Sequence, residues 1–348
     1  MSNRAFAFTF LALATSAFFV VGLLNFVVNP YAQYSTQVVQ PLVQTSRNAK
    51  LELLNSFESA PDGLLVGSSR VLKYEPAYLE QYVGHNFFNA GVNYGKPEDF
   101  LAFVRYFENR FKRLPKTIVI GLDVHGFNGQ LKTDARLLNN HPLASQIPEA
   151  IPFSDRFQSF KELLSWQQTM ASLRSIKHSL KGVENTKSPE ESFQSDGLIV
   201  YHTREEQIDS GTYDFTSALE YNKREYKQLF RGYDSISASR VELLAAAIKL
   251  CKKNGSRVIT LLTPMHPALA KYLNESTTYS ERRLELHQTL AALAIELDFE
   301  FSDLSDIRSF RGDPSHFVDG IHPLEPNTRL IIDRLLDGKP RETQYVVQ

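Results

Sequence analysis

The sequence predicts an α/β protein: a three-layer α/β/α sandwich around a five-stranded parallel sheet, preceded by one transmembrane helix. Short apolar runs alternate with amphipathic helical segments through most of the chain, which is the pattern of a parallel sheet. The apolar run 63–66 is bounded by turn residues, as is typical of a strand buried on both faces. Close to the N-terminus lies a long apolar segment without charge.

The apolar segment covers residues 5–28, which as a helix would rise about 36 Å and cross a bilayer core of about 30 Å. Arg4 precedes it, and the next charged residue is Arg47. This asymmetry predicts a cytoplasmic N-terminus with the rest of the chain on the outer side of the cytoplasmic membrane. A cleaved signal peptide is the alternative, with small-residue sites at 12–14 and 15–17, but the apolar run continues past them and favours an uncleaved anchor.

The remaining chain divides by composition. An uncharged, Gln-rich spacer follows the anchor, and a polar stretch interrupts the alternation of strands and helices. The polar stretch is interpreted either as the wall of a substrate groove or as an elaborated surface loop. The expected parts are an anchor at 1–31, a spacer with a lead-in helix at 32–59, an α/β/α domain at 60–338 with an insertion at about 126–237, and a tail at 339–348.

Apolar periodicity places the elements. The helix at 97–111 is the clearest, because five apolar side chains repeat on one face. Strands are expected at 63–66, 86–89, 117–122, 257–262 and around 299–301. Helices are expected at 47–57, 76–83, 97–111, 157–180, 239–253, 280–297 and 326–336.

Composition excludes some classes of function. Lys and Arg number 38 against 39 Asp and Glu, and no basic block is present, so nucleic acid is not an expected partner. No cofactor is expected. The single cysteine, Cys251, lies in a predicted amphipathic helix and is expected to be a buried thiol; no disulfide can form within the chain.

The first candidate site is the turn Gly67-Ser68-Ser69-Arg70, directly after the strand at 63–66. Ligands of open α/β sheets bind where such strands end. Two serines and an arginine there are compatible with a nucleophile, a phosphate cradle or only a hydrogen-bonded turn.

The second candidate is Asp319-Gly320-Ile321-His322-Pro323 near the C-terminus. A serine nucleophile needs a base, and the base needs an orienting carboxylate; Asp and His three residues apart can supply both from one loop. The alternative is a loop in which the aspartate caps the next helix. Asp313 and His316 repeat the same spacing, and these four groups also leave a metal site as a minor alternative, although no familiar ligand spacing is present.

Four short blocks follow one another along the chain: Gly67-Ser68-Ser69, Asn89-Ala90-Gly91 with Gly95, Gly121-Leu122-Asp123, and Asp319-Gly320-Ile321-His322-Pro323. Together they resemble the SGNH (GDSL-like) hydrolase superfamily over about residues 60–337, without the insertion. The combination of a Gly-Ser-Ser turn and an N-terminal anchor is similar to its membrane-anchored branch, which includes the D-alanine transfer protein of teichoic acid synthesis and the alginate O-acetylation proteins.

The resemblance implies a role for each matching residue. Ser69 would be the nucleophile, His322 the general base and Asp319 its orienting group. The oxyanion hole would draw on Ser69, Gly91, Asn93 and Gly95. Further residues expected to line the site are Ser68, Arg70, Asp123, His125, His266 and His316.

Asp123 departs from the family pattern, because the third block normally supplies an asparagine that donates to the oxyanion. A carboxylate only accepts hydrogen bonds and would repel a developing negative charge. Either Asn93 supplies the missing donor, or Asp123 points elsewhere, or the site is catalytically weak. His125 and His266 both follow strands; each is interpreted as a site residue or as an ordinary loop histidine.

These observations predict a membrane-anchored serine esterase or O-acyltransferase that acts outside the cytoplasmic membrane on an acylated cell-surface or exported polysaccharide. The substrate class, and a membrane-bound acyltransferase as partner, come from the resemblance alone. A non-catalytic protein that binds a glycan or assists assembly is the main alternative. A lipase would need an apolar groove, which the polar insertion does not favour.

Overall fold

The computed structural model describes residues 3–34, 38–39, 41–42, 45–151, 158–181 and 191–336, without the side chains of 158–160. The chain forms two compact units. The first contains Met1–Ala49 and Thr133–Pro189; the second contains Lys50–Lys132 and Glu190–Gln348. The insertion expected at about 126–237 is therefore divided between the two units, and the expected tail at 339–348 lies outside the described residues.

The second unit is built on a five-stranded parallel sheet, which confirms the predicted fold class. Its strand order is β2-β1-β3-β6-β7. The order reverses beside β1, because β2 lies on one side of it and β3 on the other. In open α/β sheets the ligand site lies outside the carboxyl ends of the strands at such a reversal. The strands are β1 (Gly63–Val66), β2 (Phe87–Asn89), β3 (Thr117–Leu122), β6 (Arg257–Leu262) and β7 (Glu300–Asp303).

The strand register aligns these carboxyl ends. Val66 pairs with Ile120, Leu122 with Leu262, and Leu262 with Asp303. Every residue of β1 and β3 is buried, as the apolar runs predicted. The polar residues that follow these strands are therefore brought to one edge of the sheet.

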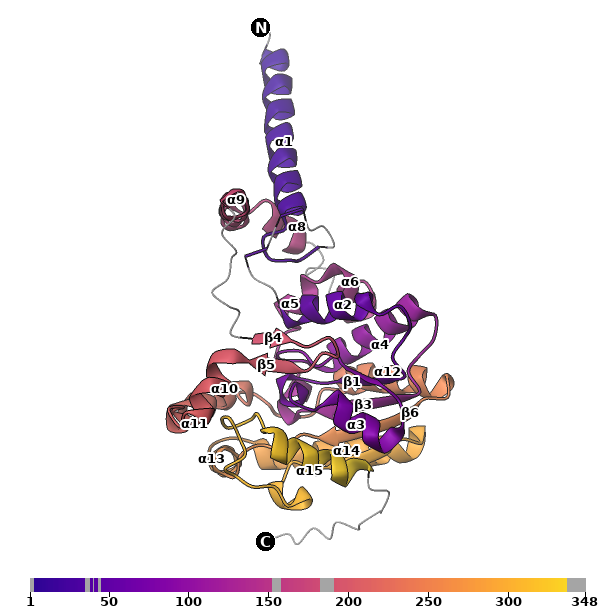
Figure 1. The fold of residues 1–348 in the computed structure, drawn as a ribbon. Coiled ribbons are helices and arrows are strands. Elements are labelled where there is room, and N and C mark those ends of the chain that lie inside the picture. Colours follow the sequence, from indigo (N-terminus) through magenta and orange to yellow (C-terminus); the bar gives the residue numbers. More distant parts are fainter. Residues whose placement is uncertain are drawn as a thin grey trace. The chain divides into compact units, whose positions relative to one another are not determined.

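Helices cover both faces of the sheet (Figure 1). On one face, α3 and α15 share a core with inward side chains of β1, β3 and β6, among them Leu65, Val119 and Ile259. On the other face, α4 packs against α12. The helices of this unit are α3 (Pro76–Val83), α4 (Pro97–Phe111), α10 (His202–Asp209), α11 (Phe215–Leu229), α12 (Ala238–Lys253), α13 (Pro267–Ser276), α14 (Tyr279–Leu297) and α15 (Glu325–Leu336), with short 3-10 turns η1 (Ser69–Val71), η2 (Val124–Phe127) and η4 (Ile307–Phe310).

Helix α4 matches its predicted bounds because several local signals agree. Pro97 starts it, Asp99 accepts from the Lys96 backbone N–H, and Lys112 ends it in the left-handed conformation. Of the five predicted apolar side chains, four are buried and Phe111 is half-buried. Each fully buried side chain stabilises the fold by about 1.5–3 kcal/mol. Cys251 is buried in α12, as expected.

The polar insertion forms elements that no apolar periodicity predicted. A two-stranded antiparallel hairpin, β4 (Glu191–Phe193) and β5 (Ile199–Tyr201), precedes α10 and α11. The hairpin docks on the main chain next to β1 and β2: the Ile199 N–H donates to Leu72 O, and the Asn89 N–H donates to Asp196 O. Helix α13 was also not predicted.

Two helix predictions need correction. The helix expected at 157–180 is two helices, α8 (Gln158–Leu163) and α9 (Trp166–Leu180), because the Ser165 hydroxyl accepts from the Gln168 N–H and starts a new helix. The helix expected at 239–253 begins one residue earlier, at Ala238. Ser239 lies inside α12, where its hydroxyl is bonded to the hydroxyl of Ser237.

The first unit contains α1 (Asn3–Val28), which is long and apolar enough to cross a membrane or to serve as a signal anchor. Most of its side chains are exposed. It ends at Asn29, which takes a left-handed conformation before Pro30. The Asn29 side chain fixes the following turn by accepting from the Gln33 and Tyr34 N–H groups. This unit also contains the short helices α5 (Ala135–Leu138) and α6 (His141–Ala144) and the 3-10 turn η3 (Pro148–Ala150), while α2 (Ser46–Ser56) crosses the boundary between the units.

Candidate active site

Ser69 follows β1 and is the first residue of the short 3-10 turn η1. Ser68 starts this turn: its hydroxyl accepts from the Arg70 N–H at 3.2 Å. Gly67 permits the turn, because a Cβ there would lie 2.8 Å from the Val71 side chain and 3.1 Å from Gly121 O. Of the two serines, Ser68 therefore holds the turn together, and Ser69 presents its hydroxyl.

The Ser69 hydroxyl meets the imidazole of His322. Their Oγ and Nε2 atoms are 2.9 Å apart. The other ring nitrogen, Nδ1, lies 2.8 Å from Oδ2 of Asp319. A serine, a histidine and a carboxylate are thus connected in a single hydrogen-bonded chain, with the imidazole between the two oxygens.

Asp319 is held by its own loop as well as by His322. Its Oδ1 accepts from the Ile321 N–H at 2.8 Å and from the His322 N–H at 2.9 Å, which leaves Oδ2 for the imidazole. Burial favours the neutral acid, but His322 and these hydrogen bonds outweigh it and hold the pKa of Asp319 below its usual value. The carboxylate is therefore ionised at neutral pH and fixes the imidazole orientation.

The insertion supports this loop. Gly320 donates its N–H to Oδ1 of Asn222, a buried residue of α11, at 2.7 Å. The Gly320 carbonyl accepts from the His266 N–H at 2.9 Å. The insertion is therefore part of the framework that holds His322, a role that its polar composition did not reveal.

Two of the expected oxyanion donors are already engaged. The Gly91 N–H donates to Asn89 Oδ1 at 2.9 Å, and the Gly95 N–H donates to Val92 O at 3.1 Å. The Asn93 amide donates to Glu191 Oε2 over a long 3.4 Å. Among the described residues, the Ser69 N–H has no hydrogen-bond acceptor. The Asn93 amide is therefore engaged as well, and of the four expected donors the Ser69 N–H is the one that an oxyanion can use without breaking a contact within the described residues.

Asn89 belongs to a block named in the sequence analysis, but it was given no role there. It is fully buried, and its amide nitrogen donates to Val71 O at 2.8 Å and to Tyr74 O at 3.1 Å. With its oxygen on the Gly91 N–H, this one side chain joins the end of β2 to the loop after Ser69. Its position at the end of the buried strand β2 is the sequence signal by which this role could have been found.

Asp123 lies at the end of β3 and pairs with Arg70 rather than facing solvent. The Arg70 Nε and Asp123 Oδ1 atoms are 3.6 Å apart, and both side chains are 2% exposed. The Thr263 hydroxyl also donates to Asp123. Burial raises the pKa of Asp123, but Arg70 and His125 outweigh it and hold the pKa below its usual value. The negative charge of Asp123 is therefore offset by the buried guanidinium of Arg70.

The Arg70 guanidinium is enclosed. It lies over the ring of Tyr226 in α11, 5.2 Å from the ring centroid, and donates to Thr263 Oγ1 at 3.3 Å. Its Nε and Nη2 atoms have no hydrogen-bond partner within the described part of the chain. Arg70 is thus a buried positioning group for the Ser69 turn.

The expected site histidines divide by environment. His125 is buried beside Asp123 and against the Tyr226 ring, and burial lowers its pKa to about 4. His266 starts α13: its Nδ1 accepts from the Ala268 N–H at 3.1 Å. His316 contributes main-chain contacts, since its carbonyl accepts from the Leu324 N–H and from the Asn327 amide.

The two Asp-x-x-His copies differ in what their carboxylates hold. Oδ1 of Asp313 accepts from the N–H and the hydroxyl of Ser315, and these two bonds close the turn from 313 to 315. Only the copy at Asp319 reaches a histidine ring and, through it, a serine. Within the described residues, no group of three or more His, Cys, Asp or Glu side chains is arranged to hold a metal ion.

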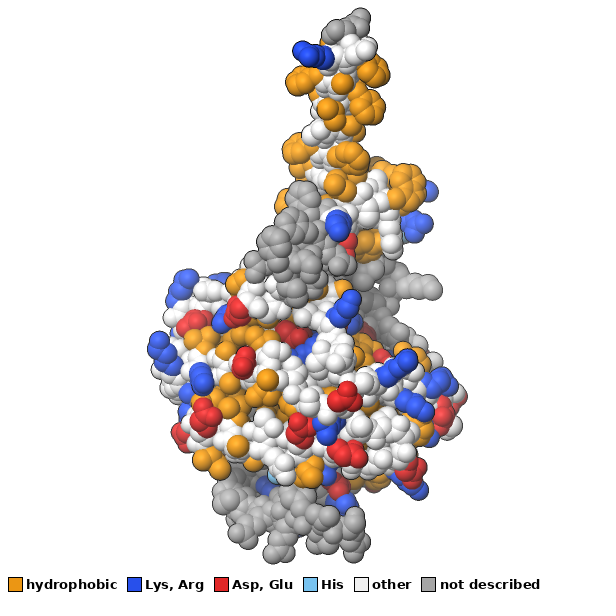
Figure 2. All heavy atoms as spheres, turned by 180° about the vertical axis from the view of Figure 1, so that it is seen from behind, with side chains coloured by type: hydrophobic (Ala, Val, Ile, Leu, Met, Phe, Trp, Pro, Cys, Tyr) orange, Lys and Arg blue, Asp and Glu red, His pale blue; other side chains and the backbone are white. Residues whose placement is uncertain are grey.

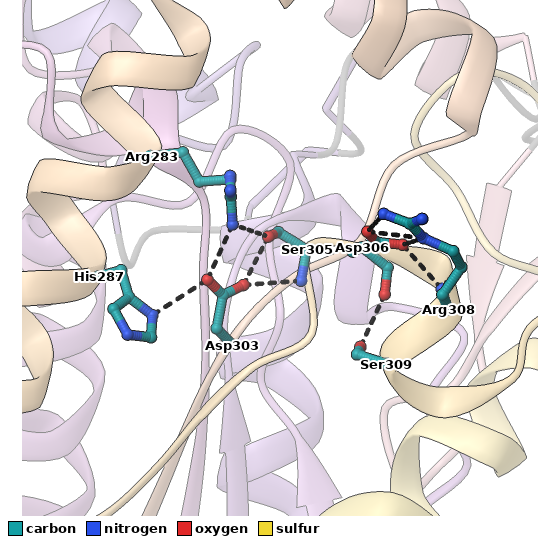
Figure 3. Close-up of polar contacts among 7 residues, drawn as sticks. All are labelled: Arg283, His287, Asp303, Ser305, Asp306, Arg308 and Ser309. Atoms are coloured by element: carbon teal, nitrogen blue, oxygen red, sulfur yellow. Dashed lines mark hydrogen bonds and ion pairs between the residues drawn. The ribbon is translucent and has the colours of Figure 1, made fainter. Parts of the chain in front are cut away.

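A second polar cluster lies at the end of β7 (Figure 3). Asp303 receives Arg283 and His287 on Oδ2, each at 3.1 Å, and the Ser305 hydroxyl on Oδ1. Here the serine donates to the carboxylate, and the histidine points to the same carboxylate rather than to the serine. Arg283 and Ser305 also line a cleft of about 720 Å³. This cluster has no activated hydroxyl.

The arrangement around Ser69 can therefore support nucleophilic chemistry. A hydroxyl with an imidazole at 2.9 Å, and a carboxylate behind that imidazole, is the geometry that activates a serine. Comparison of the sequence with protein-family models finds no match, and comparison with curated proteins finds none either.

Proposed function

We propose that this chain is a membrane-anchored serine esterase or O-acyltransferase of the SGNH-like type. The observation that supports this most is the hydrogen-bonded chain from Ser69 Oγ through His322 to Asp319 at the carboxyl end of β1. The four sequence blocks named above agree with it, since each lies at or just after a strand end or on the loop that carries His322.

In the proposed reaction, Ser69 Oγ attacks the carbonyl carbon of an acyl ester while His322 Nε2 takes the hydroxyl proton. Asp319 stabilises the resulting imidazolium. The tetrahedral oxyanion is stabilised by the Ser69 N–H, a donor worth roughly 3 kcal/mol. The Asn93 amide is the second donor and must release Glu191 to act. Collapse breaks the ester C–O bond, and His322 returns the proton to the leaving alcohol.

The acyl-serine is then attacked by a second hydroxyl, with His322 again as the base. If that hydroxyl belongs to water, the reaction is ester hydrolysis; if it belongs to a sugar, the reaction is O-acyl transfer. An exported or cell-surface polysaccharide as acceptor, and a membrane-bound acyltransferase as partner, rest on the family resemblance. The position of the α/β unit on the outer side of the cytoplasmic membrane rests on the apolar helix α1 and on Arg4 before it.

A serine-directed fluorophosphonate probe tests the proposal. We expect labelling of the wild-type chain and none of Ser69→Ala, with Ser315→Ala as a control, because Ser315 belongs to the inactive Asp313 turn. Equal labelling of wild type and Ser69→Ala would reject Ser69 as the nucleophile.

A glycan-binding or assembly protein without turnover is the second candidate. The engaged N–H groups of Gly91 and Gly95 and the carboxylate at Asp123 favour it, because each removes a donor that an oxyanion would use. Binding of an acylated oligosaccharide without release of its acyl group, by a chain whose Ser69 does not react with the probe, would select this candidate.

A further inference from the structure

Helix α9 has an unusual distribution of side chains. The side that packs within the first unit carries small and polar residues: Gln168, Ala171, Ser172 and Ser175 are buried. The opposite side carries the large apolar ones, since Trp166, Leu173 and Leu180 are 78%, 49% and 83% exposed. These three follow one another at intervals of seven residues, so they form one stripe along the helix. A helix of a globular domain normally has the reverse arrangement.

Helix α9 is fixed to the last turns of α1 by a buried polar cluster. Asn25 of α1 donates to Leu163 O at 2.7 Å and to Thr169 Oγ1 at 2.9 Å, and its oxygen accepts from the Ser172 hydroxyl at 2.7 Å. Both polar side-chain atoms of this buried asparagine thus have a partner on α9 or on the end of α8. Because a buried polar group without partners is costly, these contacts hold α9 at this level of α1.

The orientation of the α9 axis relative to α1 is the second observation. Its axis runs across that of α1 rather than along it, so that α9 is seen nearly end-on when α1 lies in the plane of the picture (Figure 1). A helix placed across the end of a membrane-spanning helix lies along the plane of the bilayer surface.

Positively charged side chains lie beside the apolar stripe of α9. Arg174, Lys177 and Lys181 are exposed on or beside it, and α9 has no acidic residue. Figure 2 shows hydrophobic side chains and Lys and Arg side chains close together around the lower end of α1. Exposed Trp and Leu with adjacent Lys and Arg is the composition of a helix that lies in the interface of an anionic bilayer.

We propose that α9 is an interfacial helix, with Trp166, Leu173 and Leu180 inserted among the lipids and Arg174, Lys177 and Lys181 on anionic headgroups. The apolar stripe would then continue the lipid contact of α1 onto a second helix. This gives the first unit two membrane attachments, a spanning helix and a surface helix joined at Asn25. The inference rests on the membrane location proposed for α1, but not on the chemistry proposed for Ser69.

Trp166 is the only tryptophan of the chain, so its fluorescence reports on α9 alone. The experiment uses the full chain, reconstituted into vesicles of anionic phospholipid and recovered by flotation. The vesicles contain lipids brominated either near the carbonyl end or near the methyl end of the acyl chain. We expect blue-shifted emission, stronger quenching by the shallow bromines than by the deep ones, and protection from aqueous acrylamide.

Two results would overturn the proposal. Emission that only acrylamide quenches would mean that α9 faces water, and emission that neither quencher reaches would mean that protein covers it. Because flotation reports separately on vesicle association, a chain that does not float points to a failure of the anchor, whereas one that floats without bromine quenching points to a failure of the α9 inference.

Variants extend the test. Leu173→Glu together with Leu180→Glu should shift Trp166 emission to the red and abolish bromine quenching, because carboxylates would draw the stripe into water. The matched control is Ile295→Glu, which changes a side chain that is 86% exposed on α14 in the other unit. Bromine quenching that persists unchanged in the double variant would contradict the proposed insertion of the stripe.

Discussion

His322 Nε2 lies 2.9 Å from Ser69 Oγ, although 253 positions separate the two residues in the chain. The parallel sheet brings them together: Ser69 follows β1, and the loop that carries His322 is held by α11 and by the turn before α13. This relationship gives the proposed function its sharpest tests, because the chain carries a second Asp-x-x-His copy as an internal control.

Replacement of His322 by glutamine should lower kcat/KM for a short-chain acyl ester by about 10³-fold or more, since the serine loses its base. His316→Gln should change it by less than about two-fold, because the hydrogen bonds that hold His316 in its loop are made by its backbone N–H and carbonyl. Steady-state kinetics compare the two variants, and melting temperatures equal to that of the wild type show that both are folded. Equal losses in both variants would show that the two loops serve stability and not catalysis.

Replacement of Asp319 by asparagine should retain the fold and lose activity. The new side-chain oxygen can still accept from the Ile321 and His322 N–H groups, so the loop is kept. The amide cannot hold the imidazole tautomer that a carboxylate selects, and a loss of about 10³–10⁴-fold in kcat is expected. Asp313→Asn is the control, and unfolding curves check that both variants remain folded. Full activity of Asp319→Asn would exclude it as the orienting group.

Removing one charge of the buried Arg70–Asp123 pair should lower the free energy of unfolding strongly. Asp123→Asn leaves a buried guanidinium without its counter-charge, and we expect a loss of about 3–5 kcal/mol in the free energy of unfolding. Arg70→Met together with Asp123→Leu should recover much of that loss, because no isolated charge remains. Denaturant titrations of Arg70→Met, of Asp123→Leu and of the double variant form the cycle. Additive losses would show that the two charges are not coupled.

Folding stability should fall on mild acidification because of His125. Its pKa in the folded state is about 4 and its ordinary value is 6.5, so the unfolded chain binds the extra proton between these values. Stability therefore decreases as pH falls from about 6.5 towards 4, by roughly 1 kcal/mol per pH unit. Asp123 favours the charged imidazole, whereas burial and Arg70, Lys96 and Arg240 oppose it.

The same decrease should be smaller in His125→Gln, which removes the titrating group. Asp319 and Asp123, whose pKa values are also lowered, contribute stability that is lost only below about pH 4. Melting temperatures measured between pH 4 and 7 therefore report on the His125 window alone. Identical pH profiles for wild type and His125→Gln would contradict this assignment.

Folding stability should depend on the hydrogen-bond donors of Asn89, which an aspartate of nearly equal volume lacks. In Asn89→Asp the side chain no longer donates to Val71 O and Tyr74 O, and a carboxylate faces two carbonyl oxygens. We expect a loss of about 2–4 kcal/mol in unfolding free energy together with reduced probe labelling of Ser69. Asn86→Asp is the control, because the side-chain oxygen of exposed Asn86 accepts from the Asp62 N–H, and an aspartate oxygen can do the same. Similar losses in both variants would contradict the role of Asn89.

Pattern alone was sufficient where local signals agreed. The strands at 63–66, 117–122 and 257–262 and the helix at 97–111 have the predicted bounds, because apolar periodicity, turn residues and caps all point to the same ends. In the insertion the local signals did not agree, because α11 is amphipathic but the segments beside it are polar. The contact by which Asn222 of α11 holds Gly320 joins residues 98 positions apart, so no local pattern predicts it. Likewise, the side chain of Asp123 cannot be oriented without Arg70 in place.

The sequence by itself determined that this chain is α/β with a five-stranded parallel sheet and that its first helix is long and apolar enough to span a membrane, because burial and periodicity are written locally along the chain. It also named Ser69, His322 and Asp319 as candidates. Only the tertiary structure decided that these three side chains form one hydrogen-bonded chain, while His316 and Asp313 do not join it. The reason is physical: hydrogen bonds depend on tenths of an ångström, and residues far apart in sequence acquire such distances only when the sheet and its loops are assembled.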